Sequence, residues 1–516
     1  MKKKTTTTPK SKIAFAPLLP SAVSARMKEA ERYAKAGDRE LALDILAEID
    51  REYPGHEYVL NTMFQGALLL QDNEYLIIAA EGLARLQPDQ PEPAMDLCIS
   101  YATGSYPLLF VKKFQDFVDR FPAFKLADAM QQAFSEMKEF VPEALGLSGL
   151  GTGEEALWAG ALLDEARLRL DQGNFDEARA NAEKVSAAYP TCVPALLIVI
   201  SAYESEDRRN EAIPALNQIL ELEPENVGAF ADMIHYHVLN GNLDQARSLA
   251  EHAKKLTVQS KDDTFALMKA LAFLGDDEGV MGLFECRFPW PVASRSRTGI
   301  FRRQAPVEEI LESERALTAV SYHFAAVSAC RLDREDDAVT LWNHALEIEP
   351  NMDRVSQNLD DLALVPSEQN GPFAFTTTFW LPEKVLTGIE EELNSFRHIK
   401  RERVYLPALS ELLDFIYDNY PETLTLIPSM LDRGDPRTRR IAMLLASYLD
   451  LPESGGALRD FALGRRGTDA QRWAALCETS ISGLFVTDTV RFWKEGKWTD
   501  VRVSEIGTED LRRIQV

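Results

Sequence analysis

His235 and His237 are the only closely spaced histidines in the chain, which makes them the first candidates for a metal site. Zinc takes imidazole nitrogens as ligands, and two ligands on one helix must share a face to reach the same ion. Residues two apart on a helix point in different directions, so these side chains are poorly placed to share an ion. We therefore predict neither a metal site nor a cofactor.

Gly146, Gly149, Gly151 and Gly153 form a stretch that superficially suggests a phosphate-binding loop. Such a loop follows a strand and continues into Gly-Lys-Ser or Gly-Lys-Thr, and neither feature is present here. We interpret the stretch as a connecting loop. Because no nucleophile, base and acid form a recognisable set and no carboxylate pair stands out, we do not predict an enzyme.

A basic segment without any acidic residue lies between Glu285 and Glu308, and Phe288, Trp290 and Phe301 are interleaved in it. Positive charge combined with aromatic rings is typical of segments that bind phosphate or single-stranded nucleic acid. The alternative, which we favour, is a loop that docks on the protein's own acidic surface. The arginines that would bind an anion are Arg287, Arg295, Arg297, Arg302 and Arg303.

The charge of the whole chain argues against general binding to nucleic acid or anionic lipid. Its 516 residues include 81 acidic and 56 basic ones, for a formal net charge of -25. A field of that sign repels both polyanions. No run of about 18 apolar residues is present, so no membrane span is predicted.

The five cysteines lie far apart and form no Cys-x-x-Cys pair. They are Cys98, Cys192, Cys286, Cys330 and Cys477. An odd, scattered set predicts free buried thiols in a reducing compartment, and hence a cytoplasmic protein.

Residues 1–20 are expected to form a disordered basic tail rather than a secretory signal. The tail carries Lys2, Lys3 and Lys4, but Pro17 and Pro20 interrupt the only apolar stretch that a signal would need.

A 34-residue repeat in the sequence predicts the helices that would position any functional site. Gly173 is followed by Ala178 five residues later and by Pro190 seventeen residues later. The same offsets recur at Gly37, Asp207 and Asp333. From Gly37, steps of 34 residues arrive at Gln71, Ser105, Glu139, Gly173, Asp207, Gly241 and Gly275.

This pattern resembles the tetratricopeptide repeat family, whose unit is two antiparallel helices in 34 residues. The resemblance implies an all-α fold, a right-handed α-α solenoid of about nine units over residues 21–365. With the turn residue at position 15, small residues are expected where helices cross, near positions 8 and 20. Units start at Val23, Glu57, Pro91, Lys125, Ala159, Val193, Val227, Lys261 and Ala319.

Two stretches depart from the period. The degenerate unit at 125–158 is expected to hold a short helix and a glycine loop. An insertion of 24 residues, at about 288–311, separates the last two units.

The remaining third is expected to begin with a linker at 366–382. Residues 383–485 then resemble HEAT repeats, because Asp435 is followed by Arg437, Arg439 and Arg440, in a region where that family has a capping aspartate and an arginine that reaches back to the neighbouring turn. Asp469 and Arg472 give a weaker second instance. Alternating residues on both sides of Glu495-Gly496-Lys497 predict a β-hairpin cap, with a tail, at 486–516.

In the tetratricopeptide family, positions 2, 5, 9, 12 and 13 of each first helix line the concave face. The resemblance therefore implies a partner-binding surface of mixed polarity, suited to an amphipathic helix or an extended peptide. The lysine and asparagine clamp with which some members hold chaperone tails is missing. The implied contacts are Tyr58, Asn61, Gln65, Met95, Ile99, Leu163, Arg167, Leu197, Glu204, His235, Val238 and Leu239.

We thus predict a non-catalytic scaffold that binds a partner peptide or protein, without a cofactor. A second hypothesis is a regulatory or catalytic module in residues 366–516, with the array as its targeting arm. A third is a phosphate or nucleic-acid sensor that works through the arginines between Arg287 and Arg303.

Overall fold

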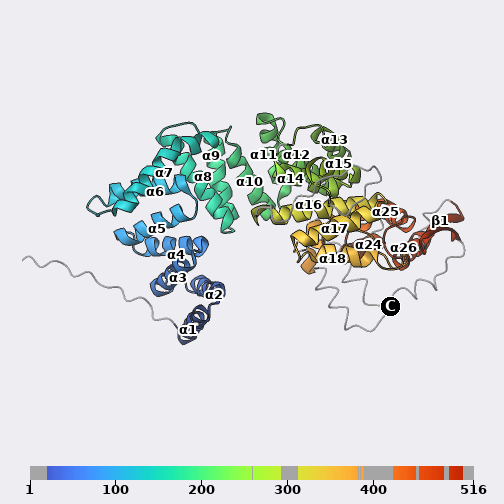
Figure 1. Cartoon of the computed structure of the whole chain (residues 1–516), viewed down its shortest axis with the longest axis horizontal. Helices are drawn as coiled ribbons and strands as arrows, with labels where there is room; N and C mark the ends of the chain where they lie inside the picture. Colours follow the sequence, from blue (N-terminus) through green and yellow to red (C-terminus); the bar gives the residue numbers. More distant parts are fainter. Residues whose placement is uncertain are drawn as a thin grey trace, which may run out of the picture. The chain divides into compact units, whose positions relative to one another are not determined.

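The computed structural model describes residues 20–258, 260–291, 312–381, 383, 385–388, 416, 422–448, 452–481 and 487–503. Apart from one hairpin, every regular element described is a helix (Figure 1). The chain divides into two compact units, residues 1–215 and 216–516. None of the described helices is long and apolar enough to cross a membrane.

The first unit is built from pairs of helices that follow one another along the chain (Figure 1). The helices are α1 (Ser21–Ala36), α2 (Arg39–Glu52), α3 (Glu57–Leu70), α4 (Asn73–Leu86), α5 (Pro91–Thr103), α6 (Pro107–Arg120), α7 (Asp128–Leu147), α8 (Glu154–Asp171), α9 (Phe175–Ala188) and α10 (Val193–Ser205). Helix α11 (Arg209–Leu222) contains the boundary between the units.

The second unit continues with α12 (Val227–Leu239), α13 (Leu243–Ala253), α14 (Lys261–Leu274), α15 (Asp277–Arg287), α16 (Glu312–Arg331), α17 (Glu335–Ile348) and α18 (Asp353–Leu362). Its remaining elements are α19 (Thr377–Trp380), α22 (Glu422–Thr425), α23 (Ile427–Arg433), α24 (Pro436–Tyr448), α25 (Pro452–Ala462), α26 (Asp469–Ile481), β1 (Thr489–Lys494) and β2 (Lys497–Arg502).

The turn inside each helix pair has one backbone conformation, and the 34-residue period locates it. Glycine adopts the left-handed region without strain, whereas other residues enter it only when their surroundings require it. Four of the five described non-glycine residues with positive φ stand at repeat position 15: Gln71, Ser105, Asp207 and Asp333. The glycines at that position, Gly37, Gly173, Gly241 and Gly275, also have positive φ.

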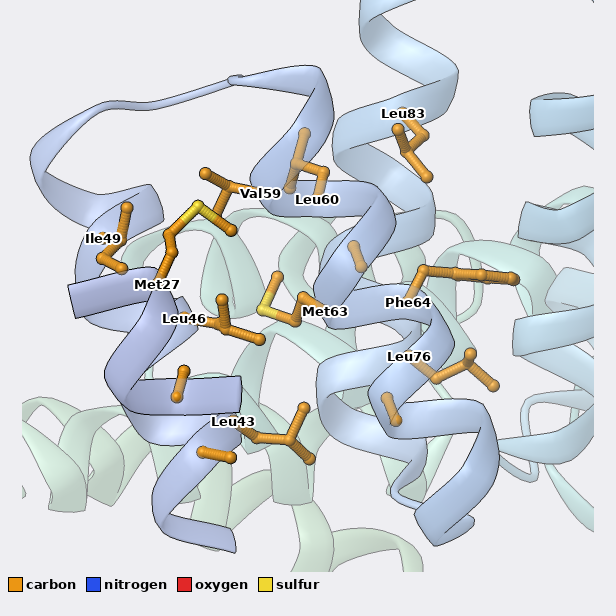
Figure 2. Close-up of a cluster of buried hydrophobic side chains, with 14 of the residues drawn as sticks. Met27, Leu43, Leu46, Ile49, Val59, Leu60, Met63, Phe64, Leu76 and Leu83 are labelled. Atoms are coloured by element: carbon orange, nitrogen blue, oxygen red, sulfur yellow. The ribbon is translucent and has the colours of Figure 1, made fainter. Parts of the chain in front are cut away.

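The core lies between paired helices, and its tightest points are positions 8 and 20. Ala30 and Ala42, which hold these positions in the first pair, are 2% and 5% exposed. Larger side chains of this pair and the next form one cluster with them, among which Figure 2 labels Leu46 of α2, Met63 of α3 and Leu76 of α4. Small residues at the crossing let two helices approach, and apolar stripes join each pair to the next.

The degenerate stretch at 125–158 differs from the expected short helix. Helix α7 has 20 residues and runs through Glu139, where the period places a turn. The expected loop does follow, with positive φ at Gly149, Gly151 and Gly153. Helix α8 packs directly on α6, where the buried Asp164 accepts hydrogen bonds from the backbone N–H groups of α6's first turn.

The insertion is described only up to Pro291. Phe288 stacks on Phe284, and Trp290 is buried against the same ring, so these aromatic side chains belong to the core. Four of the candidate anion-binding arginines lie outside the described residues: Arg295, Arg297, Arg302 and Arg303.

The stretch expected to be a linker, residues 366–382, is instead a packed part of the second unit. Phe373, Phe375 and Trp380 are 2–4% exposed, and Leu381 is 1% exposed. The period does not reveal this packing, because the stretch has no helical spacing of its own.

The HEAT-like motif behaves as the resemblance implies. The Asp435 carboxylate accepts a hydrogen bond from the Thr438 N–H at 2.7 Å, which caps the start of α24. Arg439, fully buried, reaches back to the Leu431 carbonyl at 2.8 Å. Arg472 is the second buried arginine, and it hydrogen-bonds the carbonyl oxygens of Gly467 and Trp493.

The predicted hairpin is present as antiparallel β1 and β2. Its two-residue turn, Glu495 and Gly496, has positive φ at both positions, as a primed turn requires. Phe492 packs edge-on against Trp473 of α26, and Asp469 accepts a hydrogen bond from the Glu495 N–H. The hairpin therefore covers the last described helix.

None of the five cysteines, all of which are described, forms a disulfide. Four are buried as predicted, but Cys286 is exposed, because it follows Glu285 on the outer side of α15 near its end.

Candidate functional site

The first unit leaves one face of α3 uncovered. Tyr58, Leu68 and Leu69 are 56%, 49% and 77% exposed, and Asn61 and Gln65 are exposed beside them. Spacings of three, four and seven residues place all five on one side of the helix. We call this set the α3 face. It occupies repeat positions 2, 5, 9, 12 and 13, the positions that the resemblance assigns to a partner.

Two further exposed side chains stand at the same positions in later helices of this unit. Leu197, at position 5 of α10, is 46% exposed. Arg167, at position 9 of α8, is exposed, and its guanidinium lies 4.8 Å from the centre of the Tyr106 ring. Leu197 therefore offers an apolar contact in addition to the α3 face, whereas Arg167 already donates to the Ser105 carbonyl and pairs with Asp164 at 3.8 Å.

Other predicted contacts of the first unit are part of its core. Met95 and Leu163 are 8% and 7% exposed, so the prediction that they touch a partner is wrong for this conformation. Ile99 and Glu204 are half-buried. In α5 and α8, position 5 turns toward a neighbouring helix instead of solvent, which spacing alone does not reveal.

A cavity of about 660 Å³ lies elsewhere in the first unit, lined among others by Glu81, Arg85 and Arg169. Arg169 forms an ion pair with Glu81 at 2.9 Å, and the Tyr101 hydroxyl donates to the same carboxylate at 3.0 Å. Burial, together with the Glu81 charge, raises the pKa of Tyr101. These groups satisfy one another, and their role is to hold α8 against α4.

In the second unit, the corresponding positions are already occupied by the chain itself. Residues 370–381, here called the internal segment, lie across α14, α16 and α18. Three side chains hold its backbone. The Asn358 amide accepts from the Phe373 N–H at 2.9 Å and donates to the Phe373 carbonyl at 3.0 Å. The two oxygens of Asp361 accept from the N–H groups of Asn370 and Gly371, each at 2.8 Å.

His323 supplies the third backbone contact, and its neighbours fix its tautomer. The Trp342 indole N–H, which can only donate, points at Nδ1 over 3.1 Å. Nδ1 is therefore an acceptor, and Nε2 carries the proton. The Nε2–H group donates a hydrogen bond to the Ala374 carbonyl at 3.3 Å. Complete burial, with a contribution from Arg354, lowers the pKa of His323 to about 3.

Aromatic side chains of the internal segment enter the same surface. Phe379 stacks on His235 with ring centres 5.1 Å apart and planes 6° apart. The ammonium group of Lys269 lies 5.1 Å from the centre of the Phe379 ring. Phe273 contacts the rings of Phe375 and Trp380 at 5.6 and 4.7 Å. His235 and Lys269 stand at position 9 of consecutive units, and Phe273 stands at position 13.

The C-terminal helices close the far side of the internal segment. The Thr377 hydroxyl donates to Asp435 at 3.1 Å, and Arg439 donates to the Asn370 carbonyl at 3.0 Å. Arg331, at position 13 of its unit, pairs with Asp277 at 3.1 Å and with Asp432 at 2.5 Å. The HEAT-like helices thus pack on the repeats through the segment they follow.

The remaining predicted contacts of the second unit lie in its core or against the internal segment. Val238 and Leu239 are 1% and 8% exposed, so both are core residues. His235, a predicted partner contact, stacks on Phe379 of the same chain. Arg287, the one described arginine of the basic segment, donates to the Val258 carbonyl.

Sequence reasoning missed two parts of the site. Leu68 and Leu69 stand at positions 12 and 13, so the period already pointed to them. The internal segment had a weaker signal, the pattern Phe-Ala-Phe-Thr-Thr-Thr-Phe-Trp in an otherwise polar stretch. Among the described residues, no group of three or more His, Cys, Asp or Glu side chains is placed to hold a metal ion.

The helices form pairs, and each regular pair has a left-handed turn at position 15. The chain has a tetratricopeptide-type fold. The tetratricopeptide array continues one helix beyond the ninth unit, because α18 begins where a tenth first helix would begin. Asn358 and Asp361 are positions 6 and 9 of that helix.

Comparisons with known proteins found solved structures at low similarity only. No family model matches the chain, and no curated protein matches it. A tetratricopeptide repeat protein from Parabacteroides merdae is 10% identical over 52% of this chain and 92% of its own, with a TM-score of 0.23. The C-terminal part of a TPR repeat-containing protein from Cytophaga hutchinsonii is 12% identical over 64% and 98%, with a TM-score of 0.22.

The structure of Naa15/Naa10 bound to HypK-THB is 14% identical over 92% of this chain and 74% of that one, with a TM-score of 0.24. Scores of this size do not support a shared function. The assignment of the fold rests on the chain's own repeat geometry.

Proposed function

We propose that this protein is a non-catalytic scaffold whose α3 face binds an extended apolar segment of a partner protein. The observation that carries the proposal is the contrast between the two units. Ligand-facing positions of α3 are open, whereas those of α14, α16 and α18 hold an internal segment.

The composition of the α3 face favours a peptide. Tyr58, Leu68 and Leu69 offer apolar area whose burial contributes about 25 cal/mol per Å². Asn61 and Gln65 lie between them on the same side and carry amides, which donate and accept hydrogen bonds. The internal segment gives an example of that combination in this chain, since Asn358 pairs with backbone while Phe273 receives aromatic rings.

Two rival functions find less support in the described residues. A catalytic module in 366–516 would need polar groups directed at a substrate, but Asp435, Arg439 and Arg472 hold backbone groups of their own unit. A nucleic-acid sensor would need the aromatic rings of the basic segment, and Phe288 and Trp290 are packed in the core.

Affinity capture from the native cell with the full-length chain tests the proposal. Leu69→Arg should abolish retention of the partner, because it places a charge in the centre of an apolar contact. Leu41→Arg is the matched control, since Leu41 is 38% exposed on the second helix of its pair, outside the α3 face. Equal loss with both variants, or retention with Leu69→Arg, would contradict the proposal.

A further inference from the structure

The internal segment is held in the way that proteins hold a peptide ligand. The Asn358 amide pairs with both backbone groups of Phe373, as a neighbouring β-strand would. Asp361 accepts hydrogen bonds from the N–H groups of Asn370 and Gly371. His323 contacts the carbonyl of Ala374, the residue after Phe373. Contacts of this kind bind the backbone of a peptide, so they are compatible with many side-chain sequences.

Aromatic spacing supplies selectivity beside those backbone contacts. Phe373 and Phe375 precede α19, the helical turn that carries Phe379. Both are buried, at 3% and 4% exposure. Phe379, six residues after Phe373, stacks between His235 and the ring of Phe375. The surface therefore fits aromatic residues at positions i, i+2 and i+6 of a ligand.

The chain that leads into the internal segment is exposed. Leu364 and Val365 are 43% and 57% exposed, directly after α18 ends at Leu362. The Gln369 amide donates to the carbonyls of Leu362 and Leu364, which shapes this connection as a turn. The connection into the internal segment therefore lies at the surface of the unit.

We propose that the surface formed by α14, α16 and α18 is an exchangeable peptide site, whose resident ligand is the internal segment. Its foreign ligand is a segment of a partner protein with aromatic residues at i, i+2 and i+6 that ends in one helical turn, as residues 377–380 do here. This inference goes beyond the proposed function, which concerns the first unit and stands or falls with Leu69.

The test uses the full-length chain carrying Phe373→Ser, Phe375→Ser and Phe379→Ser, which weakens the resident ligand. The probe is a fluorescent synthetic peptide with the natural sequence of residues 368–381. A tethered segment competes at an effective concentration on the order of 1 mM. We therefore expect the peptide to bind the triple variant at least about tenfold more tightly than the unaltered chain.

Two controls make the result specific. A peptide with its three phenylalanines replaced by serine should not bind. Adding Asn358→Ala to the triple variant should weaken binding of the natural peptide about tenfold, whereas adding Leu41→Arg, which lies on α2 outside both surfaces, should leave it unchanged. A folded triple variant that binds neither peptide would overturn the proposal.

The triple variant can lose its fold, and thermal melting then gives the answer. Restoration of the native melting temperature by the natural peptide, but not by the serine peptide, supports an exchangeable site. A melting temperature that neither peptide restores overturns it. Dimers of the unaltered chain that the natural peptide dissociates would identify a second copy as the ligand and would also overturn the proposal.

Discussion

The two units share one repeat pattern. Positions 2, 5, 9, 12 and 13 of α3 are exposed in the first unit, whereas corresponding positions of the second unit are covered. Of the fifteen large apolar side chains that are exposed among the described residues, eleven lie in residues 1–215 and four in residues 216–516. In the second unit, positions 9 and 13 of consecutive first helices are covered by Phe379, Phe375 and Trp380. The comparison teaches that the repeat sets which positions face outward from a helix pair but does not set whether another segment covers them.

The largest expected effect concerns the internal segment. Phe375→Ser removes a ring that is 4% exposed and leaves a cavity, so the free energy of unfolding of the second unit should fall by about 3–5 kcal/mol. Leu69→Ser in the open unit should change stability by less than about 0.5 kcal/mol. Denaturant unfolding followed by tryptophan fluorescence compares the two variants. Similar losses would mean that the α3 face is structural.

A second pair of substitutions compares the hydrogen bonds of Asn358, which holds the internal segment, with those of Asn61 on the exposed α3 face. Asn358→Ala leaves a buried N–H and carbonyl of Phe373 without partners, at a cost of about 1–3 kcal/mol for each unsatisfied group. Asn61→Ala, whose amide contacts only the carbonyl of its own helix turn, should be nearly neutral. Hydrogen exchange at the Phe373 amide measures the first effect directly, and unchanged protection would refute it.

The units should also differ in their response to acid. Burial holds His323 neutral with a folded pKa of about 3, while an unfolded histidine has a pKa of about 6.5. Between these values the unfolded chain binds the additional proton, so the stability of the second unit is complete above pH 6.5 and falls as the pH decreases. The expected slope is about 1 kcal/mol per pH unit. His323→Gln should remove it, and an unaltered slope in that variant would assign the effect to other groups.

The sequence predicted the repeats better than the contacts between them. Gln71, Ser105, Asp207 and Asp333 could be placed at left-handed turns because a fixed spacing overrides residue type. The same reasoning missed the length of α7. The helix-forming residues around Glu139 continue through the expected turn, and Pro142 is accommodated inside the helix.

The candidate site was predictable only in part, because spacing reports which side of a helix is apolar and not what covers it. Leu69 and Leu239 both stand at position 13, yet one is 77% exposed and the other 8%. Residues more than a hundred positions away contact the end of α12, since Thr425 donates a hydrogen bond to the carbonyl of Leu239. Contacts at that separation leave no mark in a local period.

Site-specific photo-crosslinking tests the contrast between the units most directly. A photoreactive amino acid is placed at position 69 in one full-length chain and at position 269 in another, and the crosslinks formed in the native cell are mapped. Position 69 should crosslink to another protein, and position 269 should crosslink within the chain, to the region of Phe379. Crosslinks to other proteins from position 269 together with none from position 69 would contradict the account.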